Sequence, residues 1–166
     1  MNVDDLALAL GLGAARGARA LARAVGAAEN GKKRVVAIGD AVARAVEQAG
    51  HEAVRAQLDG GKLSVEDATA DALCASGLPD LTVAPALLQE CARVLRDGGR
   101  VLLATPVGLV GRGPERPLLT AMFMHAGLVD IAQQLGRGTA ITIGTIRRCG
   151  LRSSVSATAP LRFNPT

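Results

Sequence analysis

The sequence predicts an α/β fold: a doubly wound, mostly parallel sheet that ends in an antiparallel hairpin and follows an N-terminal helix. First, short apolar runs with the character of buried strands alternate with segments of helical spacing. This alternation is typical of a parallel sheet covered by helices on both faces. Second, the last two strand segments are separated only by Gly136-Arg137-Gly138, and a connection this short favours an antiparallel pair.

The predicted elements follow in order along the chain. A strand over Arg34–Gly39 leads into a helix over Ala41–Ala49, and His51–Gln57 forms the second strand. Lys62–Ala70 is weakly patterned, and Asp71–Ser76 is a third apolar run. A helix then begins near Pro85 and stops at Asp97-Gly98-Gly99. A strand over Arg100–Thr105 and a helix over Arg116–His125 follow. The last two predicted strands are Leu128–Leu135 and Thr139–Arg147.

Composition limits the function classes. The 166 residues suit one domain, and 49% of them are apolar, with two Phe and neither Trp nor Tyr. Single-stranded nucleic acids usually stack on aromatic side chains, which this chain nearly lacks. The net charge of +4 is then the only support for nucleic-acid binding through the basic ends, which is a lesser alternative. The longest nearly uncharged run, Val101–Gly111, is far shorter than the roughly 20 residues of a membrane span. We expect a cytoplasmic protein without membrane contact.

Three parts are expected: residues 1–33 as an Ala- and Arg-rich N-terminal helix and linker, residues 34–148 as the domain, and residues 149–166 as a disordered tail. The helix prediction covers residues 3–28. Apolar residues occur on both sides of its first half, and arginines occur on one side of its second half. Packing in a groove of its own domain is the first expectation for this helix, and contact with another protein or a second copy is the alternative. The candidate interaction residues are Leu6, Leu8, Leu10, Leu12, Arg16, Arg19 and Arg23.

Several segments resemble a known family in the right order. Leu87–Pro106 is similar to a helix, glycine turn and strand of class I S-adenosylmethionine-dependent methyltransferases of type 11, and Asp67–Cys74 is similar to the acidic lead into that family's fourth strand. Gly50-His51-Glu52 resembles the join between its first helix and second strand. The resemblance covers roughly residues 34 to 147 and implies a Rossmann-like methyltransferase fold.

The resemblance also implies a cofactor site, which the sequence keeps only in part. A glycine-rich turn should follow the first strand, because side chains there block close approach of the cofactor, yet only Gly39 is present, followed by Asp40. The acidic residue expected at the end of the second strand is replaced by Gln57, with Asp59 two residues further on. If S-adenosylmethionine is bound, Gly39, Asp40, Gln57 and Asp59 are the candidate cofactor residues.

We therefore expect a non-catalytic methyltransferase-like domain, without cofactor, that acts as a scaffold or interaction module and associates with another protein or with itself. An active S-adenosylmethionine-dependent methyltransferase of a small molecule or protein is the alternative. Truncation of residues 1–28 should abolish association in the first case.

No other motif points to catalysis or to a metal. His51 and His125 are expected to be structural, Cys74 and Cys91 to be core thiols, and Cys149 completes an odd set without metal-ligand spacing. The loop Gly108–Gly113 lacks the Gly-Lys-Ser/Thr ending of a phosphate loop. No catalytic residue is predicted.

Overall fold

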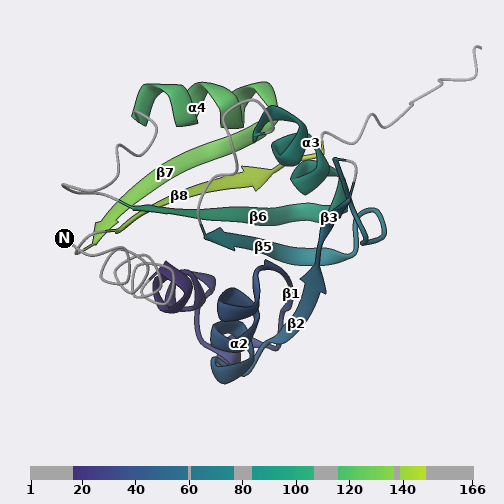
Figure 1. Cartoon of the computed structure of the whole chain (residues 1–166), viewed down its shortest axis with the longest axis vertical. Helices are drawn as coiled ribbons and strands as arrows, with labels where there is room; N and C mark the ends of the chain where they lie inside the picture. Colours follow the sequence, from purple (N-terminus) through teal and green to yellow (C-terminus); the bar gives the residue numbers. More distant parts are fainter. Residues whose placement is uncertain (1–16, 60, 77–83, 107–115, 137–138, 149–166) are drawn as a thin grey trace, which may run out of the picture.

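The computed structural model describes residues 17–59, 61–76, 84–106, 116–136 and 139–148 (Figure 1). Its main feature is a six-stranded sheet in the order β2-β1-β5-β6-β8-β7. The strands are β1 (Arg34–Ile38), β2 (Glu52–Ala56), β5 (Ala70–Ser76), β6 (Leu95–Pro106), β7 (Leu128–Gly136) and β8 (Thr139–Ile146). β1, β2, β5 and β6 pair in parallel, whereas β8 pairs antiparallel with both β6 and β7. The predicted parallel sheet with an antiparallel end is confirmed.

Helices cover both faces of the sheet. The helix over residues 17–25 and α2 (Asp40–Gln48) pack on one face, where Leu21 and Val46 share a core with Leu102 of β6. The helices α3 (Ala84–Val94) and α4 (Arg116–His125) pack on the other face, where Phe123 shares a second core with Leu73. Each core forms because every strand alternates its side chains between the two faces.

The helix over residues 17–25 belongs to the core of the domain. Ala18, Leu21 and Val25 are buried, while Arg19 and Arg23 are exposed on the opposite side, as the amphipathic pattern predicts. The predicted extent to residue 28 is wrong, because Gly26 takes a φ of +100° and ends the helix. A separate 3-10 turn, η1 (Ala28–Asn30), follows.

The other predicted interaction residues, Leu6, Leu8, Leu10, Leu12 and Arg16, lie outside the described residues. The same holds for Cys149, the predicted tail over residues 149–166 and the loop over Gly108–Gly113. None of the helices that the structure describes is long and apolar enough to span a membrane.

Two local predictions differ from the structure. β6 begins at Leu95, before the predicted start at Arg100, and the segment Asp97-Gly98-Gly99 forms an irregularity inside the strand. Gly98 has a φ of +77°, and a Cβ at Gly99 would lie 2.8 Å from the carbonyl oxygen of Arg96, so glycine fits this bulge. The weakly patterned segment contains a small hairpin of β3 (Leu58–Asp59) and β4 (Lys62–Leu63).

A buried histidine links the chain segments at the amino ends of β1 and β2 by hydrogen bonds. Buried His51 accepts a hydrogen bond at Nδ1 from the Lys33 backbone N–H (3.3 Å), and its Nε2 lies 2.7 Å from the Gly26 carbonyl oxygen. A backbone carbonyl only accepts, so Nε2 is the donor in this contact. His51 thus links the end of the helix over residues 17–25 to the start of β1, and its predicted structural role agrees with this geometry.

Candidate functional site

The order of the strands determines where a ligand site is expected. From β1 the chain moves outward to β2, then crosses back to place β5 on the other side of β1. Ligands of open α/β sheets bind beyond the carboxyl ends of the strands, beside such a reversal. The relevant edge therefore lies beyond Ile38 of β1, Ala56 of β2 and Ser76 of β5.

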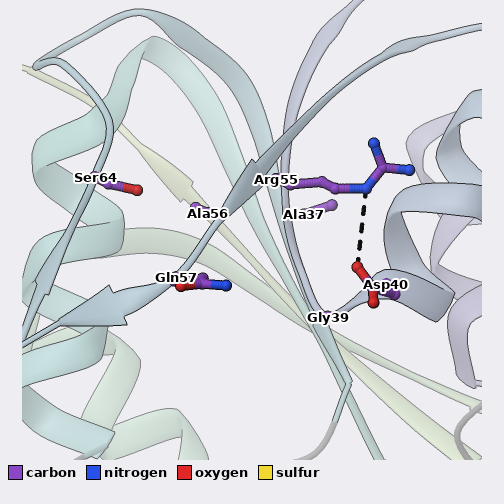
Figure 2. A pocket seen from close by; sticks show the side chains of 7 residues that line it. All are labelled: Ala37, Gly39, Asp40, Arg55, Ala56, Gln57 and Ser64. Atoms are coloured by element: carbon purple, nitrogen blue, oxygen red, sulfur yellow. Dashed lines mark ion pairs between the residues drawn. The ribbon is translucent and has the colours of Figure 1, made fainter.

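A cavity of about 390 Å³ lies at this edge, between the carboxyl ends of β1 and β2 (Figure 2). Its volume is near the lower end of the range of roughly 300–1,000 Å³ for small-molecule sites. The lining residues are Ala37, Gly39, Asp40, Arg55, Ala56, Gln57 and Ser64. Two alanines leave space on the strands, and the remaining side chains are polar or charged.

The turn from β1 into α2 consists of Gly39 alone. β1 ends at Ile38 and α2 begins at Asp40, so the turn is as short as the sequence predicts. Gly39 has a φ of +99°, which disfavours other residues, and no atom lies within 4 Å of the position of a Cβ. The backbone of this turn is therefore open toward the cavity.

Asp40 and Arg55 lie next to each other on one side of the cavity (Figure 2). The Arg55 Nε lies 3.9 Å from the Asp40 carboxylate, whereas its terminal nitrogen contacts the Glu47 carboxylate at 3.0 Å. The Asp40 side chain is 83% exposed. Exposed ion pairs contribute about 0–1 kcal/mol, so the loose contact leaves the Asp40 oxygens accessible to a ligand while Glu47 holds the guanidinium.

The structure brings three of the four candidate cofactor residues together. Gly39, Asp40 and Gln57 line the cavity, and Gln57 is exposed. Asp59 lies in β3, opposite Lys62 in the small hairpin, and is not among the lining residues.

Arg55 and Ser64 are lining residues that sequence reasoning missed. Arg55 had a sequence signal, because Asp40 and Glu47 lie seven residues apart on one face of α2 and could have indicated a basic partner on the adjacent strand. Ser64 had no such signal, because the β3–β4 hairpin positions it.

The helix over residues 17–25 approaches the same carboxyl edge of the sheet at β5 and β6. A Cβ at Gly17 would lie 2.8 Å from the Ser76 Oγ at the end of β5 and 3.4 Å from the Cβ of Ala104 in β6. Gly17 thus lies directly over the carboxyl ends of these two strands. A glycine at such a position allows close packing of helix and strand, as in dinucleotide-binding folds.

Other reactive groups in the described residues lie away from the cavity. His51 precedes β2 and His125 ends α4 just before β7, so both lie toward the opposite edge of the sheet. Burial raises the pKa of Cys74 and of Cys91 to about 12, which makes both thiols unreactive at neutral pH. Within the described ranges no group of His, Cys, Asp and Glu has the arrangement of a metal site.

Comparisons with known proteins agree with this architecture. A SAM-dependent methyltransferase from Archaeoglobus fulgidus has a TM-score of 0.56 at 12% identity, over 69% of this chain and 86% of that one. One from Thermotoga maritima has a TM-score of 0.53 at 12% identity, over 82% and 91%. The S-adenosylmethionine-dependent methyltransferase SibL has a TM-score of 0.50 at 16% identity, and this chain spans only 52% of it. At these identities the likeness establishes the fold alone.

The sequence comparison is more specific. No curated protein matches the chain, but residues 8–103 match the family model described as a methyltransferase domain. The match begins well before β1 and so includes the N-terminal helix, and it covers more than half of the chain. The chain therefore belongs to the methyltransferase domain family.

Proposed function

We propose that the domain binds S-adenosylmethionine at the cavity between β1 and β2 and acts as a methyltransferase. The observation that carries the proposal is the Asp40 carboxylate, which lines the cavity and is 83% exposed. A carboxylate at the carboxyl end of a strand can accept hydrogen bonds from both hydroxyls of a ribose.

The position of Asp40 in the sequence supports this role. Gly11-Leu-Gly-Ala-Ala-Arg-Gly17 is glycine-rich and leads into the helix over residues 17–25. In nucleotide-binding α/β folds an acidic residue for the ribose follows such a segment by about 20 residues, at the end of the next strand. Asp40 satisfies this spacing, and the family match includes both segments. This assignment takes residues 11–17 of the sequence as the glycine-rich element, instead of Gly39.

The other lining residues suit a nucleoside. Ala37 and Ala56 are the small apolar residues of the lining, and Gln57 and Ser64 offer hydrogen bonds at the far side of the cavity. Arg55 is held by Glu47 and does not neutralise Asp40 by close contact. When bound, S-adenosylmethionine would supply the activated methyl group, and this chain would bind and orient it.

A non-catalytic binding module is the second candidate. It is favoured by the absence of a histidine at the carboxyl edge in the described residues, because a general base for methyl transfer to oxygen or nitrogen is most often histidine. The one-residue turn at Gly39 also favours it. In this case the fold would serve as a scaffold for another protein.

Calorimetric titration with S-adenosylhomocysteine and S-adenosylmethionine separates the two candidates. We expect binding that Asp40→Ala weakens by at least roughly tenfold, or about 1.4 kcal/mol. Glu52→Ala is the matched control, because Glu52 forms a comparable exposed ion pair at 3.8 Å with Arg34, at the other end of β2. Absence of binding to the unmodified chain would favour the non-catalytic module. Binding that survives Asp40→Ala would show that the site lies elsewhere.

A further inference from the structure

The β3–β4 hairpin contributes to the wall of the cavity without belonging to the six-stranded sheet. Its strands have two residues each, and among the described strands they pair only with each other. An isolated two-stranded hairpin is only marginally stable in water, so other contacts must hold this one in place. Ser64 directly follows β4 and lines the cavity, on the side away from Asp40 and Arg55 (Figure 2). The shape of the cavity therefore depends on what fastens the hairpin to the domain.

Apolar packing orients Ser64 toward the cavity. Leu63 is buried, and the partly buried Val65 packs against the same core, to which α3 also contributes. Successive side chains of an extended chain point to opposite sides, so Ser64 faces away from this core, and it is exposed. A rotation of the segment would turn the Ser64 hydroxyl away from the cavity.

Two side chains of α3 bind the backbone on both sides of Ser64. Glu90 Oε2 accepts a hydrogen bond from the Leu63 N–H at 3.0 Å. Arg93 donates from one terminal nitrogen to the Leu63 carbonyl oxygen (3.1 Å) and from the other to the Val65 carbonyl oxygen (3.1 Å). Glu90 and Arg93 also form an ion pair with each other at 2.8 Å. One ion pair thus holds three backbone groups next to a residue that lines the cavity.

Arg93 also binds the segment that follows Val65. Its guanidinium contacts the Asp67 carboxylate, and its backbone carbonyl oxygen accepts a hydrogen bond from the Ala68 N–H at 3.0 Å. The side chains of Glu90 and Arg93 are only 15% and 31% exposed, so water competes less for these bonds than for those of an exposed ion pair. The planar guanidinium can serve several acceptors at once, which an ammonium group does poorly.

We propose that Glu90 and Arg93 are positioning residues of the cofactor site, which hold Ser64 in the wall of the cavity without contacting the ligand. This inference rests on the proposed function, because it takes the cavity as the site of S-adenosylmethionine. Neither Glu90 nor Arg93 is among the residues that line the cavity. An effect of their replacement on ligand affinity would therefore be transmitted through the hairpin.

Calorimetric titration of the full chain with S-adenosylhomocysteine tests the inference in Arg93→Lys. Lysine keeps the charge but cannot reproduce the fork of hydrogen bonds to the two carbonyl oxygens. We expect the affinity to fall by roughly two- to tenfold, which corresponds to one lost hydrogen bond to the ligand. Arg148→Lys is the matched control, because Arg148 also donates to backbone carbonyl oxygens, those of Arg93 at 3.0 Å and Leu95 at 3.1 Å, but does not line the cavity. Its affinity should be unchanged.

A double-mutant cycle with Ser64→Ala separates positioning from a general loss of stability. Ser64→Ala should weaken binding by a similar factor in the unmodified chain and should have little further effect in the Arg93→Lys background, because the hydroxyl is already displaced. Asp40→Ala, on the other side of the cavity, should have its full effect in both backgrounds. Strict additivity of Ser64→Ala and Arg93→Lys would overturn the inference, and so would full affinity of either single variant.

Amide hydrogen exchange without ligand distinguishes failure of this inference from failure of the proposed function. Glu90→Ala removes the acceptor of the Leu63 N–H, so this amide should exchange faster than in the unmodified chain, whereas amides of β1 and β5 should keep their protection. Unchanged exchange at Leu63 would overturn the inference alone, even if the unmodified chain binds the ligand. An unmodified chain that binds no S-adenosylhomocysteine would overturn the proposed function, and the inference with it.

Discussion

The contact between Gly144 of β8 and Phe123 of α4 predicts a large effect of one added methyl group. Phe123 is fully buried. A Cβ at Gly144 would lie 2.6 Å from the Phe123 Cδ1, 3.2 Å from its Cε1 and 3.1 Å from the Cβ of Leu128. Carbon atoms normally approach to about 3.5–4.0 Å, so the Phe123 ring must move by roughly 1 Å to accept the methyl group.

We therefore expect Gly144→Ala to destabilise the domain by about 1–3 kcal/mol, the usual cost of overpacking a core. For a chain of this size each kcal/mol lowers the melting temperature by roughly 2–4 °C, which gives a decrease of about 2–12 °C. Circular dichroism during thermal and urea unfolding is the suitable assay, because the chain has neither Trp nor Tyr for fluorescence.

A double-mutant cycle with Phe123→Leu supplies the control. The smaller leucine should accept the new methyl group, so the double variant should be more stable than the sum of the two single effects predicts. Strict additivity of the two effects would refute the steric reasoning. A Gly144→Ala variant as stable as the unmodified chain would refute it as well.

Three further predictions concern other contacts. His51→Ala should cost about 1–3 kcal/mol for each buried group left unpaired, as measured by urea unfolding, and a cost below about 0.5 kcal/mol would contradict the described hydrogen bonds. The hydrogen bond from Arg93 holds the pKa of Glu90 below its usual value of 4.5. The Glu90–Arg93 contact therefore stabilises the fold fully above pH 4.5, and this stabilisation is lost as the pH falls through the lowered pKa of Glu90. The stability difference between the unmodified chain and Glu90→Gln should therefore shrink on acidification, and a difference that grows would contradict this sign. Cys74 and Cys91, whose pKa values are about 12, should react with iodoacetamide only after unfolding; labelling of either thiol in the native chain would contradict their burial.

The sequence was sufficient where local pattern determines structure. The helix over Arg116–His125 was predicted with its observed bounds, and the β7–β8 hairpin was predicted from its short glycine-containing connection. Apolar spacing and glycine turns act over a few residues, so they can be recognised without knowledge of the partners. The β3–β4 hairpin was missed because its strands have only two residues each.

The candidate site could be predicted only in part. Gly39, Asp40 and Gln57 were identified from the resemblance, and the structure places them around one cavity. Arg55 lines the same cavity because β2 pairs with β1, and Ser64 lines it because the β3–β4 hairpin positions it there. Such contacts between distant segments depend on the register of the strands, which the sequence pattern does not contain.

By itself, the sequence determined the fold class, most helices and strands, and the buried face of the N-terminal helix, because all of these follow from periodicity along the chain. Only the tertiary structure decided that β1 lies beside β5, that the cavity opens between β1 and β2, and that Phe123 packs on Gly144. It also decided that the large exposed apolar side chains of the described residues belong to α4 and β7. These features arise when segments distant in the sequence pack together, and the free energy of that packing is shared among many residues.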